Sequence, residues 1–292
     1  MNEKPAWSAN GATAAVSITF DNLGEAAELE LGIWPKDQPL GQHFSVHEAL
    51  PRLLDTLSSQ SVRATFFIEG LNAEVYPETL RDLTERGHEV ALHAWRHEHW
   101  ANLDRNAESR LLVRATRAMR AAGLAPVGFR PPGGGLTANT GELLAAHGYR
   151  YASPAGDREG IDDGLSILPF RWSLVDAFAF MPQFAGLRER FSGSAEAIPP
   201  DEMSRAICAS LTEHASTGGH LALLFHPFAL AATGDPAWAA LEQVLAAASQ
   251  LANEDLVELM RMDEAADWML GHPRDFSYAP RVDDATWMTS SG

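Results

Sequence analysis

Residues 14–20 have the sequence "AAVSITF", and Asp21 follows directly. The run is apolar at nearly every position, which is typical of a strand buried on both faces of a parallel sheet. Short runs of the same kind recur along the chain. They cover residues 62–68, 88–93, 126–130, 149–153, 165–170, 221–225 and 255–260. The chain therefore reads as a series of buried strands.

Longer amphipathic stretches separate these runs, and several end in a glycine, such as Gly87, Gly123 and Gly148. Glycine is the usual residue after the C-terminus of a helix. Seven or eight strand–helix units over about 270 residues favour a barrel or a doubly wound sheet. We expect one catalytic domain over residues 1–271. Residues 272–292 lose the periodicity and are expected to form a surface tail.

The composition excludes several classes of protein. The chain has 292 residues and a formal net charge of −17. A field of that sign repels phosphate backbones and anionic lipid, so we expect neither nucleic acid nor membrane as a partner. With Cys208 as the single cysteine, no internal disulfide and no cysteine-based zinc site can form.

The N-terminal residues lack a cationic start followed by an apolar stretch and a cleavage site, so we expect no signal peptide. No run approaches the roughly 18 apolar residues of a membrane span. These features predict a cytoplasmic protein.

Charged or titratable residues follow the apolar strands directly. Asp21, His93, Arg130 and His226 each stand at the end of a run, and Asp176 follows residues 169–175, a strand or an extended loop. In strand–helix folds the residues that do chemistry lie where a strand ends and a loop begins. These five positions therefore predict an active site on one face of the sheet.

The segment "HAWRHEHW", residues 93–100, holds three histidines. If the chain turns helical after the strand, His93 and His97 project from one face and can hold one divalent ion. The alternative is that they cap a helix or lie on a solvated face. His99 has the wrong helical phase, so we expect it at the surface or behind the ligands.

Each of the other candidates also has a structural alternative. Asp21 is a metal ligand or a general base for water, or a solvated loop residue. Arg130 opens a proline–glycine turn and can orient a carboxylate, or it packs along the surface. His226 precedes Pro227 and can donate a proton near neutral pH, or it is a hydrogen-bonded core histidine.

Five segments, "SITFDN", "GHEVALHAWRH", "FRPPGG", "WSLVDAF" and "LLFHP", occur in an order that resembles the polysaccharide deacetylase family, carbohydrate esterase family four. The resemblance runs from about residue 14 to residue 260. It implies an α/β fold, a distorted (β/α) barrel of about seven strands. It also implies removal of an acetyl group from N-acetylated sugars with a divalent metal, often zinc. The family includes a similar branch that hydrolyses cyclic amides such as allantoin, and cytoplasmic peptidoglycan deacetylase-like members.

The resemblance also assigns catalytic roles. Asp21 matches the aspartate that activates water, and Arg130 the arginine that orients it. His226 matches the general acid, and Asp176 the carboxylate that pairs with it. A metal would polarise the amide carbonyl while the aspartate takes a proton and the histidine delivers one to the departing nitrogen.

The implied metal ligands are His93, His97 and Asp21. The family usually has a second aspartate that completes the metal site, and Asn22 stands at that position here. A neutral amide binds a dication less well than a carboxylate unless another oxygen substitutes. Asp21 itself can take that role, or the site holds no metal at all.

A long segment, residues 24–46, follows the first strand where family members commonly run from glycine–proline into a helix. It offers Glu25 and Glu28 as substitute ligands. It also carries Trp34, Pro35 and Phe44, which can cover the barrel mouth. A covered pocket suits a small substrate better than a long polymer.

The sequence therefore predicts a hydrolase of a non-peptide carbon–nitrogen bond, most simply a metal-dependent deacetylase of an N-acetylated sugar or small amide. The alternatives are a metal-independent cyclic amidohydrolase resembling allantoinase and a non-catalytic sugar- or metabolite-binding protein. Zinc suits the ligands, and cobalt, nickel and manganese are also compatible with them. Residues 193–203 and the tail are candidate contacts of a homo-oligomer.

Overall fold

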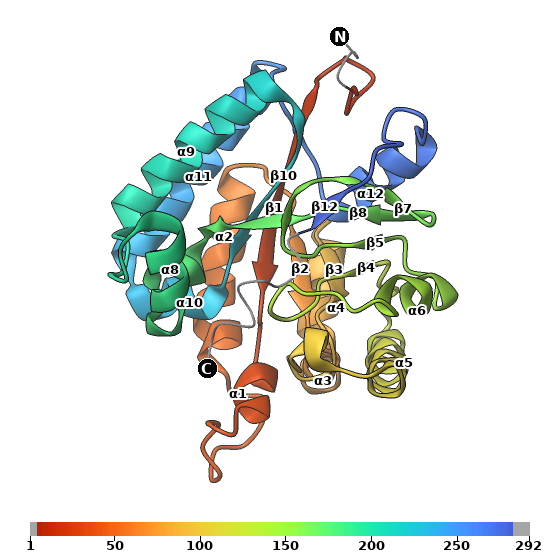
Figure 1. Ribbon diagram of the computed structural model, residues 1–292. Coiled ribbons are helices and arrows are strands. Elements are labelled where there is room, and N and C mark those ends of the chain that lie inside the picture. Colours follow the sequence, from red (N-terminus) through yellow and green to blue (C-terminus); the bar gives the residue numbers. More distant parts are fainter. Residues whose placement is uncertain (1–4, 283–292) are drawn as a thin grey trace.

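The computed structural model describes residues 5–282, and they form a twisted sheet that curls on itself with helices around the outside (Figure 1). Within this part of the chain the main sheet has ten strands. Nine of them run in the order β7-β8-β5-β4-β3-β2-β1-β10-β9, and β11 pairs with β1.

The strands that surround the centre are parallel to their neighbours. In chain order they are β1 (Ala14–Asp21), β2 (Thr65–Ile68), β3 (Glu89–Leu92), β4 (Gly128–Phe129), β5 (Tyr151–Ala152), β9 (Phe170–Val175) and β10 (Gly219–Phe225). The remaining strands are β6 (Gly156–Arg158), β7 (Gly160–Asp162), β8 (Leu165–Ile167), β11 (Glu258–Leu259) and β12 (Arg281–Val282).

The helices connect successive strands and cover the outer face of the sheet (Figure 1). They are α1 (Ala26–Glu30), α2 (Leu50–Ser59), α3 (Gly70–Val75), α4 (Pro77–Glu85), α5 (Arg105–Ala121), α6 (Thr140–Ala146), α7 (Asp176–Phe180), α8 (Ala185–Ser192), α9 (Pro200–Thr217), α10 (Pro227–Thr233), α11 (Asp235–Asn253) and α12 (Met262–Gly271). The long helices α9 and α11 lie side by side, and α1 with the loop after it projects beyond the strand ends (Figure 1).

Strand β1 lies at the middle of the sheet. It pairs with β10 from Ala14↔Gly219 to Phe20↔Phe225, and with β2 up to Asp21↔Phe67. Each of its residues is buried, as the unbroken apolar run predicts. The strand therefore carries Asp21 to the centre of the carboxyl edge.

A single parallel bridge between Ala155 and Phe170 joins the segment after β5 to the start of β9. This bridge brings together the two ends of the set β1, β2, β3, β4, β5, β9 and β10. The expected distorted barrel of about seven strands is thus confirmed. Its distortion has a local cause, because β4 and β5 are only two residues long and leave few ladder hydrogen bonds at that side.

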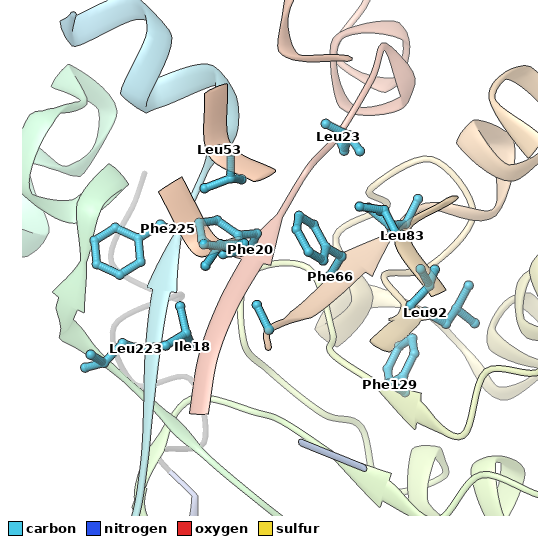
Figure 2. Close-up of a cluster of buried hydrophobic side chains, with 14 of the residues drawn as sticks. Ile18, Phe20, Leu23, Leu53, Phe66, Leu83, Leu92, Phe129, Leu223 and Phe225 are labelled. Atoms are coloured by element: carbon cyan, nitrogen blue, oxygen red, sulfur yellow. The ribbon is translucent and has the colours of Figure 1, made fainter. Parts of the chain in front are cut away.

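Alternation along β1 divides the core into an outer and an inner part. Ile18 and Phe20 point outward, and Phe20 lies between Phe66 and Phe225, with ring centroids 5.1 and 6.1 Å away, beside Leu53 of α2 (Figure 2). Burying each such side chain contributes roughly 1.5–3 kcal/mol. The residues between them point inward. Polar groups therefore line the inside of the barrel while the outer layer holds it together.

The boundaries of some elements differ from the sequence prediction. The expected strand over residues 165–170 is two strands, because Pro169 has no amide hydrogen and interrupts the ladder between β8 and β9. Residues 170–175 are a strand rather than an extended loop, so Asp176 does follow a strand end. The short strands β6 and β7 were not predicted, since each is only three residues long.

Part of the expected C-terminal tail packs on the barrel. Phe276 is fully buried against Trp7, with ring centroids 4.7 Å apart, and β12 pairs antiparallel with β6. Residues 283–292 lie outside the described residues, and the domain boundary after residue 271 stays a prediction. Across residues 5–282, no helix combines the length and the apolar character needed to cross a membrane.

The glycine of β4 offers a test of the barrel packing. A Cβ at Gly128 would lie 1.9 Å from Cζ of Tyr151, whose hydroxyl donates to Glu89 at 2.9 Å. We expect Gly128→Ala to lower the free energy of unfolding by about 1–3 kcal/mol or more, because this ring must move. Gly141→Ala is the matched control, since its Cβ meets nothing within 4 Å and should stabilise α6 by about 0.4–1 kcal/mol. Urea unfolding of both variants measures the difference, and equal stabilities would contradict the packing.

Candidate active site

A cavity of about 750 Å³ opens at the carboxyl edge of the barrel. Asp21 ends β1, and His93 and Arg130 directly follow β3 and β4. These three side chains and His226, which follows β10, line the cavity, as does His97. The sheet therefore brings together the residues that the sequence singled out.

Asp21 and Arg130 form an ion pair at the floor of this cavity. Arg130 Nη1 donates to Asp21 Oδ1 at 2.7 Å and to Thr19 Oγ1 at 2.9 Å. Its Nε and Nη2 donate to Ser153 Oγ at 3.2 and 3.0 Å, and the guanidinium carbon lies 3.9 Å from the ring centroid of Phe67. Neither charged side chain is exposed by more than 3%. This arrangement leaves Asp21 Oδ2 as the carboxylate oxygen that is free to act.

Asp21 and His226 are the two candidate proton carriers, and burial by itself raises the pKa of the first and lowers that of the second. Burial raises the pKa of Asp21, and the charges of Arg130 and His226 offset part of this rise. A carboxylate with a raised pKa is better matched to accept a proton near neutral pH. Asp21 is thus suited to act as a general base.

His93 is held in one tautomer. Its Nδ1 lies 2.8 Å from the carbonyl oxygen of Arg130, and a carbonyl only accepts, so Nδ1 carries the hydrogen. Burial lowers the pKa of His93 to about 3, so the ring is neutral. Its Nε2 therefore presents a lone pair, 3.8 Å from Asp21 Oδ2. Two acceptors that face each other across this distance fit a cation between them.

The chain does not turn helical after β3, which was the condition for His93 and His97 to share a helix face. The chain forms a tight turn in which Ala94 and His97 have left-handed backbones, with φ of 61° and 75°. Glu98 Oε2 accepts hydrogen bonds from the amides of Trp95 and Arg96 at 3.0 and 2.9 Å and fixes the turn. This turn, rather than helical spacing, places the rings of His93 and His97 with centroids 5.1 Å apart.

His97 is also neutral, because burial and then the neighbouring His93 lower its pKa to about 3. Neutral imidazole is the form that binds metal ions. Within residues 5–282, no three His, Cys, Asp or Glu side chains converge as a group that could hold a metal ion. The donor chemistry of the two histidines beside Asp21 fits a divalent ion, and a further oxygen is needed to complete its coordination. His99 lies at the exposed rim of the cavity.

His226 belongs to a second buried pair. Its Nδ1 donates to Asp176 Oδ1 at 2.6 Å, and its backbone amide donates to Asp176 Oδ2 at 2.7 Å. Burial alone would lower the pKa of His226, but the charge and hydrogen bond of Asp176, with a smaller effect of Asp21, raise it overall. Its Nε2 is the nitrogen left for the cavity. Protonated His226 is therefore a suitable proton donor.

The segment after β1 contributes to the cavity wall through Glu28 and His43, whose Oε1 and Nε2 lie 3.3 Å apart. Glu25 has a different place. It is fully buried, and its Oε1 accepts from Tyr76 OH at 2.7 Å and from two backbone amides of the same segment. These bonds hold the loop in its fold, so Glu28 is the better placed of the two carboxylates that the sequence offered as substitute ligands.

Sequence reasoning missed three residues of the site. Ser153 and Thr19 accept hydrogen bonds from the guanidinium of Arg130, and Glu69 accepts one from Asn22. Ser153 and Glu69 follow strands β5 and β2 closely, so the strand-end criterion applies to them as it did to Asp21. Thr19 could be found from alternation, since it lies two residues before Asp21 on the same side of β1.

The fold and the arrangement of the site resemble those of the polysaccharide deacetylases, and comparison with known proteins points the same way. A family model described as polysaccharide deacetylase matches residues 9–152, which include Asp21, His93, His97 and Arg130. Over these residues the chain is similar to the polysaccharide deacetylase family. Asp176 and His226 lie beyond the matched residues.

Individual relatives extend the likeness. A peptidoglycan deacetylase of Helicobacter pylori is 29% identical over 109 residues, 37% of each chain. A solved structure from Mycobacterium smegmatis, itself provisionally assigned as a polysaccharide deacetylase, is 28% identical with a TM-score of 0.78 over 97% of both chains. An allantoinase structure has a TM-score of 0.70 at 17% identity, covering 92% of this chain and 95% of its own, which shows a shared fold. The matched residues span 37% and 34% of the lengths of the first two curated relatives.

Removing the guanidinium tests the Asp21–Arg130 pair. We expect Arg130→Met to cost about 3–5 kcal/mol of unfolding free energy, because it leaves a buried carboxylate without its partner. The loss should shrink as the pH falls, since protonated Asp21 needs no counter-charge. Arg105→Met is the control, because Arg105 and Glu142 form an ion pair with side chains 47% and 70% exposed. Denaturant unfolding over a range of pH measures both, and equal losses would refute the pairing.

The His226–Asp176 pair predicts a pH dependence. Because the pKa of His226 is raised, the stabilisation from the pair is fully present below the ordinary histidine value of about 6.5 and is lost as pH rises through the folded-state pKa. Asp176→Asn removes the cause of the rise and leaves burial, so the pKa should fall. NMR titration of the His226 Cε1–H signal measures it, with Asp201→Asn on an exposed helix as the control. An unchanged titration midpoint in Asp176→Asn would show that this carboxylate does not control His226.

Proposed function

We propose that this protein hydrolyses a non-peptide amide bond, and that the reaction is the metal-dependent removal of an acetyl group from an N-acetylated sugar or a small amide. The observation that carries the proposal is the pair of acceptors His93 Nε2 and Asp21 Oδ2, 3.8 Å apart in a cavity that His226 also lines. A base, an acid and neutral imidazoles in one pocket are the components of amide hydrolysis.

The proposed roles follow from the hydrogen bonds. His93 and His97 would hold a divalent ion, with zinc suited to imidazole and carboxylate donors, and Asp21 beside them as a further ligand. When bound, such an ion polarises the substrate carbonyl and lowers the pKa of water. Asp21, oriented by Arg130, accepts the proton of the attacking water.

The second half of the reaction requires a proton on the leaving nitrogen. Amines leave poorly as anions, so the carbon–nitrogen bond breaks as the nitrogen is protonated. His226 Nε2–H donates that proton, and Asp176 keeps the ring in the donor tautomer with its raised pKa. The proton taken up by Asp21 balances the one that His226 gives.

The cavity wall supports a small substrate. Leu31 and Ile33, 69% and 64% exposed, line the mouth on one side, and Met181, Phe184 and Leu187 line it elsewhere. Apolar groups around a pocket with few polar ones suit a small molecule that is enclosed by the site. Trp172 also lines the cavity and offers a flat face to a sugar ring. Cytoplasmic location and homo-oligomerisation stay predictions.

A metal-independent hydrolase of cyclic amides is the second candidate. Two observations favour this candidate. Among residues 5–282 no three metal-binding side chains converge, and the chain shares its fold with the allantoinase structure. It would use Asp21, Arg130 and His226 in the same positions without an ion.

Metal content and turnover distinguish the candidates. We expect about one zinc or cobalt ion per chain by mass spectrometry after loading, which the double variant His93→Ala/His97→Ala should lose. Hydrolysis of N-acetylglucosamine derivatives should disappear in His226→Ala and in Asp21→Asn while circular dichroism stays unchanged. Activity on cyclic amides that survives exhaustive chelation would favour the second candidate. Saturable ligand binding without turnover of any amide would contradict both and indicate a binding protein.

A further inference from the structure

Position 22 faces a buried carboxylate. Asn22 follows Asp21 with a left-handed backbone, φ 60°, and its Nδ2 donates to Glu69 Oε1 at 2.6 Å. Glu69 is fully buried and stands directly after β2. The side chain at the position of the family's second aspartate is therefore not free to rotate.

The same carboxylate is held on its other side. Asn72, fully buried in α3, donates from Nδ2 to Glu69 Oε2 at 2.9 Å. Glu69 thus accepts one hydrogen bond from each of two amides. An aspartate at position 22 would set a second carboxylate at hydrogen-bond distance from Glu69, and two like charges so close oppose ionisation of both. The amide of Asn22 meets this carboxylate without adding a second charge.

The hydrogen bond also orients Asn22. An asparagine side chain has a donor end and an acceptor end, and the donor end is committed to Glu69. Asn22 lines the catalytic cavity, so its Oδ1 is the atom that it offers there.

We propose that Glu69 is a positioning residue that holds the carbonyl oxygen of Asn22 toward the ion site beside His93 and His97. This inference rests on the proposed metal-assisted function. It supplies the oxygen that the two histidines and Asp21 need to complete a coordination shell, from a residue type outside the His, Cys, Asp and Glu groups. It also explains how a chain with asparagine at this position can keep a metal site, because amide carbonyl oxygens bind divalent ions when they are held in place.

Zinc affinity of the full-length protein tests the proposal. The dissociation constant is measured by competition with a chromophoric chelator at neutral pH, and the visible absorption of the cobalt form reports the coordination. We expect Asn22→Ala and Glu69→Leu each to weaken zinc binding by about 10- to 100-fold, the range of losses typical of groups that orient metal ligands. Asn106→Ala is the control, since Asn106 is an exposed asparagine of α5, and it should leave zinc affinity unchanged.

A double variant separates positioning from a general structural effect. If Glu69 acts through Asn22, then Asn22→Ala/Glu69→Leu binds zinc no more weakly than Asn22→Ala alone. Losses that add, or zinc affinity and cobalt spectra at wild-type values in both single variants, would overturn the inference.

An exchange of groups keeps the test decisive if Glu69→Leu does not fold. In Asn22→Asp/Glu69→Gln the amide and the carboxylate trade places, so the glutamine can donate to Asp at position 22 while still accepting from Asn72. We expect this variant to bind zinc at least as tightly as the wild type, and loss of zinc binding would overturn the proposal.

The outcomes also separate this inference from the proposed function. A wild-type protein that hydrolyses acetylated sugars and binds zinc regardless of Asn22 and Glu69 would refute only the inference. A protein that shows the expected zinc pattern but hydrolyses no amide would refute only the proposed function.

Discussion

The ion pair of Asp21 and Arg130 is the constraint on which the site depends. Both side chains are withdrawn from solvent, and such a pair is tolerated only where the guanidinium has further partners. Thr19 of β1, the ring of Phe67 in β2 and Ser153, which follows β5, meet this requirement. The pair therefore ties the inner face of the barrel together, and the backbone carbonyl of the same arginine fixes His93. One residue, Arg130, thus determines the free oxygen of the aspartate through its side chain and the free nitrogen of His93 through its backbone.

Two histidines in the same cavity have opposite electrostatic properties because of what their Nδ1 atoms meet. His93 donates to a neutral carbonyl, and burial keeps it uncharged with a pKa of about 3. His226 donates to the carboxylate of Asp176, and the pKa of that ring is raised. Burial acts in the same direction on both, so the partner decides the outcome. This difference gives one lone-pair donor and one proton donor within a single pocket.

Much of this arrangement could be predicted from the sequence. The strand ends of a parallel sheet meet at one edge, so Asp21, His93, Arg130 and His226 were expected together without knowledge of the structure. The turn between His93 and His97 was not predictable from spacing. It depends on left-handed backbones at Ala94 and His97, and neither alanine nor histidine indicates such a conformation in a sequence.

The remaining gaps have physical causes as well. Glu69 follows a strand just as Asp21 does, but only the structure shows its contact with the site. Its Oε1 accepts a hydrogen bond from Asn22 Nδ2 at 2.6 Å. The closure of the barrel rests on a single bridge between Ala155 and Phe170, which carries no sequence pattern. Strands of two or three residues, such as β6 and β12, are too short to show alternation.

The pairing of β1 with β10 has a consequence for how the chain folds. Ser17 and His220, whose side chains are hydrogen-bonded at 2.9 Å, are 203 positions apart. During synthesis β1 therefore cannot pair with β10 until most of the polypeptide has emerged. Until then an apolar strand with unpaired amides and carbonyls is exposed to other chains, which is the condition that favours aggregation. Contacts this distant in sequence also slow folding. The order of synthesis therefore delays completion of the central strand pairs until β10 is available.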